Sequence, residues 1–370
     1  MRKKFISEKL ILKIMDICKL TKKEKIVLYG LSKYPKFTDK KLSEKLKLKH
    51  STVTSIRHRL KVNEFYRSFI IPRLQNMGCK MLVVIYSNFS PIVPLEERVK
   101  ITGETIEVFD EIFFSAGVQD KGFSLSLAQN YATIGKINDI RTKTFGGRGL
   151  LEDEYPSMIV FPFEISKVYR FFDYAPLLKS NFNLDVKLDG TLKNIGFKNE
   201  GIIILTNSEK KVYCMLIQYP ELHDSEIGEK IGVSRHTVSR LRRNFEEKNL
   251  IRKINLPNLK KLGFEILTFY HIRFDPRNSP NMEKDEASQL LGNSTIFMAS
   301  RMFEAFMLSV HSNYDDYNKD KTRVMQILKE NKWIAKDPKI LTYSLNELIF
   351  IKDFRFTPIA KKTIGCEFEL

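Results

Sequence analysis

The chain is poor in the residues that build metal, redox and disulfide sites. Its four cysteines are scattered and form no CxxC pair, which is typical of idle or buried thiols in a reducing cytoplasm. Its six histidines show no HxxxH spacing and have no cysteine at metal-ligand spacing, so we expect no metal site and no cofactor. These residues are Cys18, Cys79, Cys214, Cys366, His50, His58, His223, His236, His271 and His311.

The sequence also shows no pattern typical of a signal peptide, a membrane span or a phosphate-binding loop. The apolar residues of Phe5–Cys18 are interrupted by Glu8, Lys9, Lys13 and Asp16, which favours an amphipathic helix. The glycine-rich Phe145–Gly149 follows a predicted helix and lacks the lysine of a phosphate loop. With 43% hydrophobic and 29% charged residues, the sequence predicts a globular cytoplasmic protein.

What the chain does have is an internal duplication. Residues 21–91 align without a gap to residues 206–276, and 20 of these 71 positions are identical. Two later blocks repeat at slightly shorter spacings: Gly122–Tyr131 matches Ala305–Tyr314, and Tyr169–Ser180 matches Ile351–Lys362. A period this long exceeds that of solenoid repeats and indicates a two-domain unit used twice. We call the two units the first copy and the second copy.

The positive charge is concentrated in the first part of each copy. The net charge of +18 divides into 22 Lys and Arg against 6 Asp and Glu in residues 1–80, 12 against 7 in residues 206–262, and 28 against 31 elsewhere. Lysines that merely follow genome composition would be spread evenly. The uneven distribution therefore favours a polyanion as the partner of the two basic segments.

The basic part of the second copy predicts a winged helix-turn-helix. Gly232 suits a left-handed turn and Ser234 suits a helix N-cap. The helix that follows, from about Arg235 to Lys248, places an apolar stripe on one face and donors on the other. The stripe is Val238, Leu241 and Phe245. Leu250–Leu256 then reads as a short strand, the expected wing.

The first copy repeats this pattern with one weaker position. Leu42, Leu46, Leu48, Val53, Ile56 and Leu60 occupy the core positions. Lys47 stands where Gly232 stands, which costs about 1 kcal/mol for a left-handed residue that is not glycine.

The second half of each copy reads as strand, helix, strand, strand, helix, strand, an order that gives an antiparallel sheet with helices on one face. In the second copy we expect a helix at Met282–Leu291 and one last strand at Lys339–Lys352; the last strand of the first copy is Ser157–Tyr169. The predicted fold is α+β, with each winged helix followed by a ferredoxin-like βαββαβ domain and the open sheet faces buried against each other. The predicted domains are an N-terminal helix (1–20), winged helices (21–75 and 206–260), βαββαβ domains (76–180 and 261–370) and a linker (181–205).

A family resemblance follows from the second winged helix. The segments Ser225–Ser234, Thr237-Val238, Arg240-Leu241, Asn249–Ile251 and Lys261–Phe264 resemble the leucine-responsive regulator (Lrp/AsnC) family of winged-helix transcription factors. The resemblance extends over essentially both copies. It implies a DNA-binding transcription regulator of archaeal type, in which the fused copies form a pseudo-dimer.

The candidate DNA contacts are donors on the predicted recognition helices and basic residues of the wing. They are Arg235, His236, Thr237, Ser239, Arg240, Arg243, Arg252 and Lys253 in the second copy and His50, Ser51, Thr52, Ser55, His58 and Arg59 in the first. Because the donors of the two helices differ, we expect an asymmetric DNA site, with more base readout by the second copy.

Two alternatives stay open. Siroheme decarboxylases resemble the same fold and occur as paired or fused units, but their active-site stretch, rich in His and Arg, has no counterpart at Val310–Tyr314. We therefore expect a protein that is not an enzyme. The other alternative is an activator whose βαββαβ domains recruit basal transcription machinery. The expected partner is double-stranded DNA, and the sequence leaves open a small-molecule effector and a dimer of pseudo-dimers.

Overall fold

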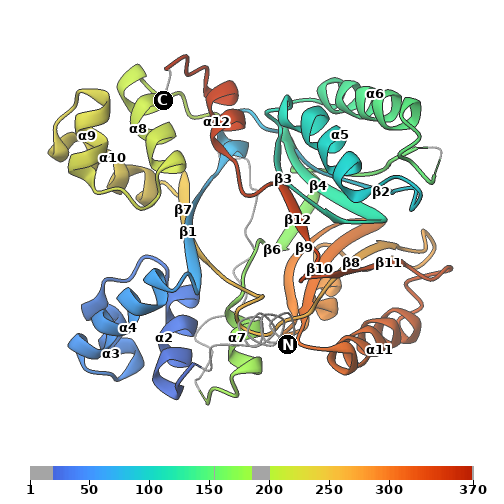
Figure 1. Cartoon of the computed structure of the whole chain (residues 1–370), viewed down its shortest axis with the longest axis horizontal. Helices are drawn as coiled ribbons and strands as arrows, with labels where there is room; N and C mark the ends of the chain where they lie inside the picture. Colours follow the sequence, from blue (N-terminus) through green and yellow to red (C-terminus); the bar gives the residue numbers. More distant parts are fainter. Residues whose placement is uncertain (1–19, 154, 186–200, 369–370) are drawn as a thin grey trace, which may run out of the picture.

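The computed structural model describes residues 20–153, 155–185 and 201–368, in which the duplication appears as two similar sets of helices and strands (Figure 1). The first copy contains α2 (Lys22–Lys33), α3 (Asp39–Leu46), α4 (His50–Val62), β1 (Tyr66–Pro72), η1 (Leu74–Met77), β2 (Met81–Asn88), α5 (Leu95–Glu107), β3 (Ile112–Val118), β4 (Lys121–Ala128), α6 (Tyr131–Gly147), β5 (Ser157–Pro162), β6 (Ser166–Arg170) and α7 (Ala175–Asn181). The second contains α8 (Asn207–Gln218), α9 (Asp224–Ile231), α10 (Arg235–Glu247), β7 (Ile251–Pro257), β8 (Ile266–Arg273), η2 (Glu286–Leu290), β9 (Thr295–Arg301), β10 (Glu304–His311), α11 (Tyr314–Glu330), β11 (Lys339–Ser344), β12 (Ile349–Lys352) and α12 (Thr357–Ile364).

Two five-stranded antiparallel sheets form the part of the molecule away from the winged helices. The strand order is β12-β3-β4-β2-β5 in the first sheet and β11-β8-β10-β9-β6 in the second. β5 stays beside β2 of its own copy, whereas β6 crosses to pair with β9, and β12 crosses in the same way to pair with β3. The predicted α+β fold with tandem units is confirmed, and the final strand of each copy is exchanged.

A buried cation at the same place in each exchanged strand attaches it to the other copy. Arg170 ends β6, and its Nη1 donates to the carbonyl oxygens of Gly292 and Thr295, each at 2.6 Å. Lys352 ends β12, and its Nζ donates to the carbonyl oxygen of Phe109 at 2.7 Å. Because buried charged groups are costly unless they are hydrogen-bonded, these contacts favour the exchanged arrangement over an unpaired strand end.

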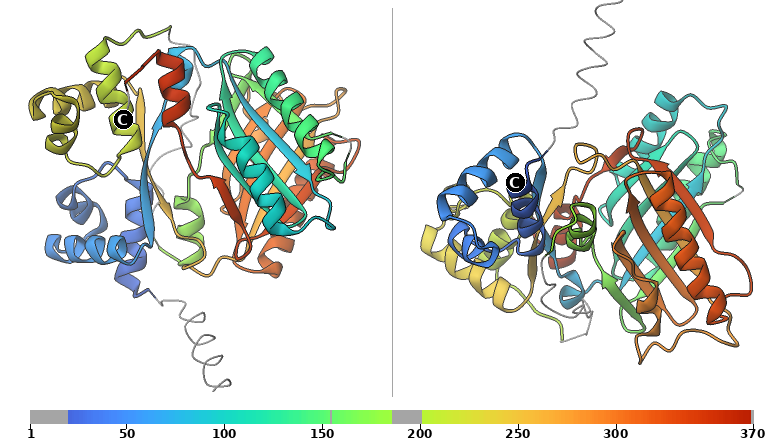
Figure 2. Two further views of the ribbon diagram at one scale, coloured as in Figure 1. Left: turned by 45° about the horizontal axis from the view of Figure 1, so that its top comes forward. Right: turned by 90° about the horizontal axis from the view of Figure 1, so that it is seen from below.

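The two sheets pack face to face through aromatic side chains. The ring of Phe123 on β4 lies 5.5 Å from that of Phe269 on β8 and 5.3 Å from that of Tyr343 on β11. Helices cover the outer faces: α5 and α6 lie on the first sheet and α11 on the second (Figure 2). The sheet face that the sequence leaves uncovered in each copy is thus buried against the other copy.

A two-stranded ribbon joins the winged helices. β1 and β7 pair antiparallel from Tyr66 opposite Pro257 to Pro72 opposite Ile251. At the centre Phe69 pairs with Ile254, its equivalent in the repeat, so a pseudo-two-fold axis passes through this pair. Each wing is therefore one strand rather than a hairpin. An unpaired strand edge exposes backbone donors and acceptors. The pairing of β1 with β7 gives each wing hydrogen-bond partners for the facing backbone groups.

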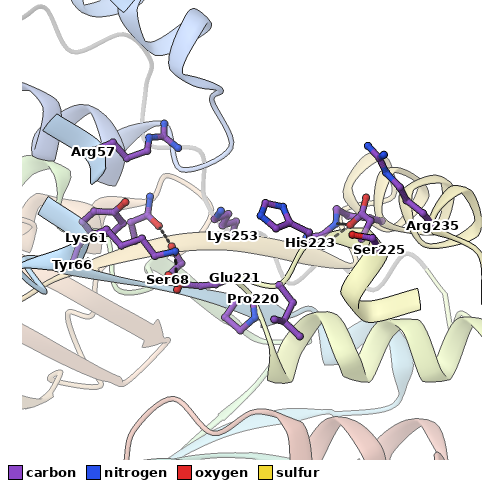
Figure 3. Close-up of a pocket in the computed structure, with 14 residues that line it drawn as sticks. Arg57, Lys61, Tyr66, Ser68, Pro220, Glu221, His223, Ser225, Arg235 and Lys253 are labelled. Carbon is purple, nitrogen blue, oxygen red and sulfur yellow. Dashed lines mark hydrogen bonds and ion pairs between the residues drawn. The ribbon is translucent and has the colours of Figure 1, made fainter. Parts of the chain in front are cut away.

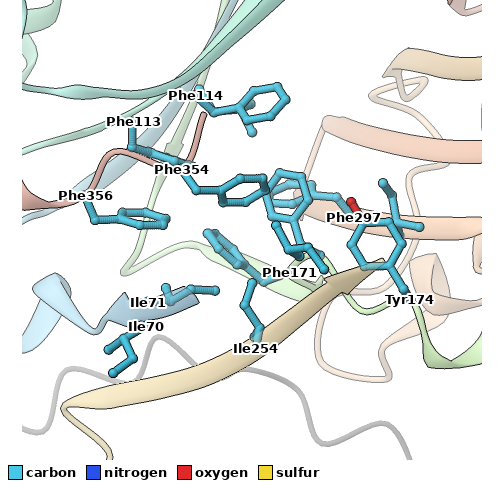
Figure 4. Close-up of a cluster of buried hydrophobic side chains, with 14 of the residues drawn as sticks. Ile70, Ile71, Phe113, Phe114, Phe171, Tyr174, Ile254, Phe297, Phe354 and Phe356 are labelled. Carbon is cyan, nitrogen blue, oxygen red and sulfur yellow. The ribbon is translucent and has the colours of Figure 1, made fainter. Parts of the chain in front are cut away.

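An aromatic cluster connects this ribbon to the sheets (Figure 4). The rings of Phe172 and Phe354, which follow the two exchanged strands, meet edge to face at 4.6 Å. Phe113 on β3 stacks on Phe356 at 4.5 Å, and Ile254 of the ribbon belongs to the same buried cluster. This core is continuous from the winged helices to the inner faces of the sheets. The helical tails strengthen the connection, since α7 packs on α2 and α12 packs on α8.

Some predicted elements differ from the structure. The helix expected at Met282–Leu291 is only the short 3₁₀ helix η2, because Asp285 has φ of +54° and the side chain of Asn281 accepts from the backbone of Glu283 and Lys284. The last strand of each copy is broken into two by a turn, so that its second part reaches the other sheet. The predicted N-terminal helix (1–20) falls almost wholly on residues 1–19, outside the described part, as do residues 186–200 of the predicted linker.

None of the helices within the described ranges combines the length and apolar character that a bilayer span requires.

Candidate nucleic-acid interface

α10 is the helix that the sequence predicts to be the recognition helix of the second copy, and local residues explain how it is held. Ser234 Oγ accepts from the Thr237 backbone N–H at 3.1 Å, which caps the helix as predicted. Val238, Leu241 and Phe245 are buried, so the opposite side of the helix faces solvent. Gly232, with φ of +69°, supplies the left-handed turn before it.

α4 takes the same role in the first copy with weaker local signals. Val53, Ile56 and Leu60 form its buried stripe. Lys47 adopts the left-handed conformation with φ of +54°, as its alignment with Gly232 predicts. Lys49 precedes the helix and makes no side-chain cap. The first recognition helix is therefore defined more by its packing than by its ends.

An arginine–aspartate pair locks each recognition helix to the helix before it. Arg242 on α10 donates from Nε to Asp224 on α9 at 2.8 Å. Arg57 on α4 makes the equivalent ion pair with Asp39 on α3 at 2.6 Å. None of these four residues is among the predicted contact residues, although both pairs are identical at aligned positions of the repeat. That identity was the signal that would have found them.

The structure places the predicted contact residues as follows. Those with exposed side chains on the recognition helices are Arg235, His236, Arg240, Arg243, His50, Ser51, Ser55, His58 and Arg59. Thr237, Ser239 and Thr52 are half-buried. Arg240 and Arg243 lie one turn apart on the open face of α10, so this face presents two guanidinium groups to solvent.

Arg59 is already engaged within its own domain. Its Nε lies 2.8 Å from a carboxylate oxygen of Glu24 on α2. Partial burial alone would raise the pKa of Glu24, but hydrogen bonds from Thr21 and the charge of Arg59 outweigh it and lower the pKa below its ordinary value. The equivalent position in the second copy is Asn244, so the two helices differ at this place.

Arg252 and Lys253 lie on the ribbon instead of on projecting wings. Arg252 is exposed and pairs with Ile71, whereas Lys253 is half-buried and pairs with Ile70. The side chain of Lys253 lies between the two winged helices, between Lys61 and His223 (Figure 3). The side chains of Arg252 and Lys253 therefore have different surroundings, although the sequence predicts that both belong to one basic wing.

Between the winged helices lies a hollow of about 670 Å³, which we call the seam groove (Figure 3). Both copies line it, and the second copy contributes the start of α9. The lining residues are Arg57, Lys61, Tyr66, Ser68, Pro220, Glu221, Leu222, His223, Asp224, Ser225, Arg235, Arg242, Lys253 and Asn255. Five of them are Lys or Arg and two are Asp or Glu, so the groove carries an excess of positive charge.

Two ion pairs cross the seam at equivalent places with opposite polarity. Lys61 pairs with Glu221 at 3.1 Å, and Lys36 pairs with Glu246 at 3.9 Å. Position 36 aligns with 221 and position 61 with 246, so the first copy supplies both lysines and the second copy both glutamates. Two first copies, or two second copies, would bring like charges together here. The duplication has thus become chemically asymmetric at its axis.

A second hollow, the junction cavity of about 430 Å³, lies between the ribbon and the sheets. Its walls are mainly apolar, with Phe114, Phe172 and Leu308 among them. The Lys and Arg residues of its lining are Arg67 and Lys260, and Arg67 pairs with Asp353 at 2.5 Å. Among the described residues, no group of three His, Cys, Asp or Glu side chains could hold a metal ion.

No protein-family model and no curated protein matches the sequence. Among solved structures, the siroheme decarboxylase NirDL is similar over 93% of this chain and 99% of its own length, with a TM-score of 0.50 and 10% identity. A transcriptional regulatory protein of the AsnC family from Pyrococcus furiosus matches over 39% of this chain and 89% of its own, with a TM-score of 0.30 and 23% identity. E. coli AsnC matches over 38% of this chain and 93% of its own, with a TM-score of 0.28 and 14% identity. The chain therefore shares the overall fold of NirDL, with two similar units in tandem.

Proposed function

We propose that the protein is a DNA-binding transcription regulator that reads promoter DNA through α4 and α10. The observation that carries the proposal is the exposed donor face of each recognition helix, opposite a buried apolar stripe. A helix of this kind can present donors to base edges in the major groove while its other face holds the domain together. The concentration of positive charge in the winged helices, against a near-neutral remainder, supports a polyanionic partner.

The rigid connection between the two helices also supports DNA binding. The ribbon, the two seam ion pairs and the aromatic cluster fix the separation of α4 and α10 within one chain. A fixed separation selects a fixed spacing of half-sites. Because the exposed residues of α4 and α10 differ, the two half-sites should differ in sequence.

The test is fluorescence anisotropy with the full chain, a duplex from upstream of its own gene and a scrambled duplex, across a salt series. Arg240→Ala and Arg243→Ala should each weaken binding to the upstream duplex by about 1–3 kcal/mol, the range for a base-reading arginine, and reduce the preference for it. Arg148→Ala is the control, because this exposed arginine follows α6 on the far sheet. Equal affinities of all three variants for the upstream duplex, and an equal preference for it over the scrambled duplex, would contradict base readout by α10.

A siroheme-decarboxylase-like enzyme is the second candidate, and the full-length likeness to NirDL favours it at the level of the fold. The junction cavity is the place to test it. A tetrapyrrole with several carboxylates needs several cations, whereas this lining contains Arg67 and Lys260 together with Glu64 and Asp353. Titration of the full chain with siroheme, followed by its absorption spectrum and by release of carbon dioxide, distinguishes the two functions. Saturable binding with turnover would replace the regulator proposal.

A further inference from the structure

Two cations of the seam groove have no ion pair within the described residues, the exposed Arg235 and the half-buried Lys253. Arg57 is paired with Asp39, Arg242 with Asp224, and Lys61 with Glu221. Within the described ranges, Lys253 has neither an ion pair nor a side-chain hydrogen bond, although it is half-buried in the groove that these three cations also line. A partly buried charge that lacks a counter-ion is costly, so its presence here calls for an anion from outside.

The cationic neighbours of Lys253 also disfavour its charged form. Burial lowers the pKa of the Lys253 ammonium, and the charges of Arg57, Arg242 and Lys61 lower it further against the opposing effect of Glu221. An anion placed in the groove would reverse these effects, because it would stabilise the charged amine.

The geometry points to a phosphate-binding site in the seam groove, with Lys253 as its central ligand and Arg57, Arg242 and Arg235 around it. The hollow of about 670 Å³ is open to solvent and large enough for a phosphate group with its ester substituents. Arg57 and Arg235 stand on opposite sides of Lys253 and come from different copies (Figure 3). The site exists only because the two winged helices are held together, since neither copy alone supplies both sides.

The site is also asymmetric across the pseudo-two-fold axis. The residue equivalent to Lys253 is Ser68, whose Oγ donates to the side chain of Asn255 at 2.7 Å. Of these two equivalent ribbon positions only the second copy's carries an amine, so the Lys253 amine is offset to one side of Phe69 and Ile254. If the proposed function holds, the occupant is a backbone phosphate of DNA between the two half-sites, and this step rests on that function. The same chemistry would also accept a free phosphate compound.

The first arm of the test needs no DNA. The melting temperature of the full chain is measured in inorganic phosphate and in chloride at equal ionic strength, for the wild type, Lys253→Gln and the control Lys136→Gln, whose lysine is exposed on α6. We expect Lys253→Gln to raise the melting temperature in chloride, because it removes a repelled cation. Phosphate should then stabilise the wild type and Lys136→Gln but not Lys253→Gln. An equal response of all three proteins overturns the site.

The second arm identifies the occupant. The slope of log binding constant against log salt is measured on the upstream duplex, and the loss of one phosphate contact should reduce its magnitude by about 0.9 in Lys253→Gln and leave it unchanged in Lys136→Gln. A phosphate response with an unchanged slope supports the site and makes a free phosphate compound its occupant. A phosphate response without any DNA binding supports the site but removes the proposed function. DNA binding with no effect of Lys253→Gln in either arm overturns the site and leaves the proposed function standing.

Discussion

The hydroxyl of Tyr86 on β2 lies 3.0 Å from Nδ1 of His271 on β8, and the two residues occupy equivalent positions of the repeat, 185 residues apart. The other ring nitrogen of His271, Nε2, lies 3.3 Å from a carboxylate oxygen of Glu304. Because an ionised carboxylate only accepts, Nε2 carries a proton, and in the neutral ring Nδ1 then accepts from Tyr86. The pseudo-two-fold axis therefore passes through a buried hydrogen bond between the sheets as well as through the ribbon.

Replacement of Tyr86 by Phe should weaken the contact between the sheets. The variant keeps the ring but leaves His271 Nδ1 without a donor, which costs about 1–3 kcal/mol for a buried polar group. The free energy of unfolding from urea denaturation measures the loss. Tyr131→Phe is the matched control, because Tyr131 is 59% exposed. Equal stability of the two variants would show that the bond contributes nothing to the packing of the sheets.

Glu304 should make the stability of the protein depend on pH. Burial acts to raise its pKa, but hydrogen bonds from His271 and Arg301 outweigh this and lower the pKa below the ordinary value of 4.5. A carboxylate with a lowered folded-state pKa stabilises the fold fully above its unfolded pKa and loses this effect as pH falls through the folded pKa. The stability difference between wild type and Glu304→Gln should thus be constant above about pH 5 and shrink below about pH 4. Denaturation curves at several pH values test this, and a difference that does not change with pH contradicts it.

The left-handed turn before each recognition helix offers a reciprocal pair of substitutions. Lys47→Gly should stabilise the first winged helix by about 1 kcal/mol, because a lysine is strained at φ of +54°. Gly232→Lys should destabilise the second by about the same amount, because it introduces the same strain at φ of +69°. Melting curves of both variants, compared with that of the wild type, show whether each substitution raises or lowers the melting temperature. Shifts of the same sign would show that backbone conformation does not control these turns.

The seam ion pairs predict a rescue by charge exchange. Lys61→Glu places a carboxylate beside Glu221, and Glu221→Lys places an amine beside Lys61, so each change alone should destabilise the protein. The double variant restores an attractive pair. Because both side chains are well exposed, we expect a coupling energy of only about 0.2–1 kcal/mol in the double-mutant cycle. Additive effects of the two changes would mean that the pair is present without stabilising the seam.

The sequence was most informative where local patterns decide structure. The apolar stripe of Val238, Leu241 and Phe245 predicts the orientation of α10 because helical periodicity alone determines which side is buried. The left-handed conformation of Lys47 follows from its alignment with a glycine. The spacing of the repeat likewise predicts that two sheets are available to cover each other.

Long-range pairing was not accessible in this way. Nothing in the composition of Ser166–Arg170 specifies that β6 pairs with β9 instead of its own sheet, because a strand edge accepts any strand with suitable side chains. The pairing of β1 with β7 is equally non-local, so the sequence predicts the strand at Leu250–Leu256 but not its partner in the other copy. The predicted helix near Met282 failed because a left-handed Asp285 interrupts it, and no residue pattern in that segment indicates such a turn.

The exchange of β6 and β12 also bears on how this chain can change over evolutionary time. A protein made of two independent copies can lose one of them and keep a working half. Here a deletion of either copy would remove the fifth strand of the remaining sheet and the partner of its wing, leaving two unpaired strand edges and an uncovered aromatic face. Such a fragment would be prone to aggregation. Each copy can therefore diverge in its surface residues, but a single copy would need a second molecule to supply its missing strand and the partner of its wing.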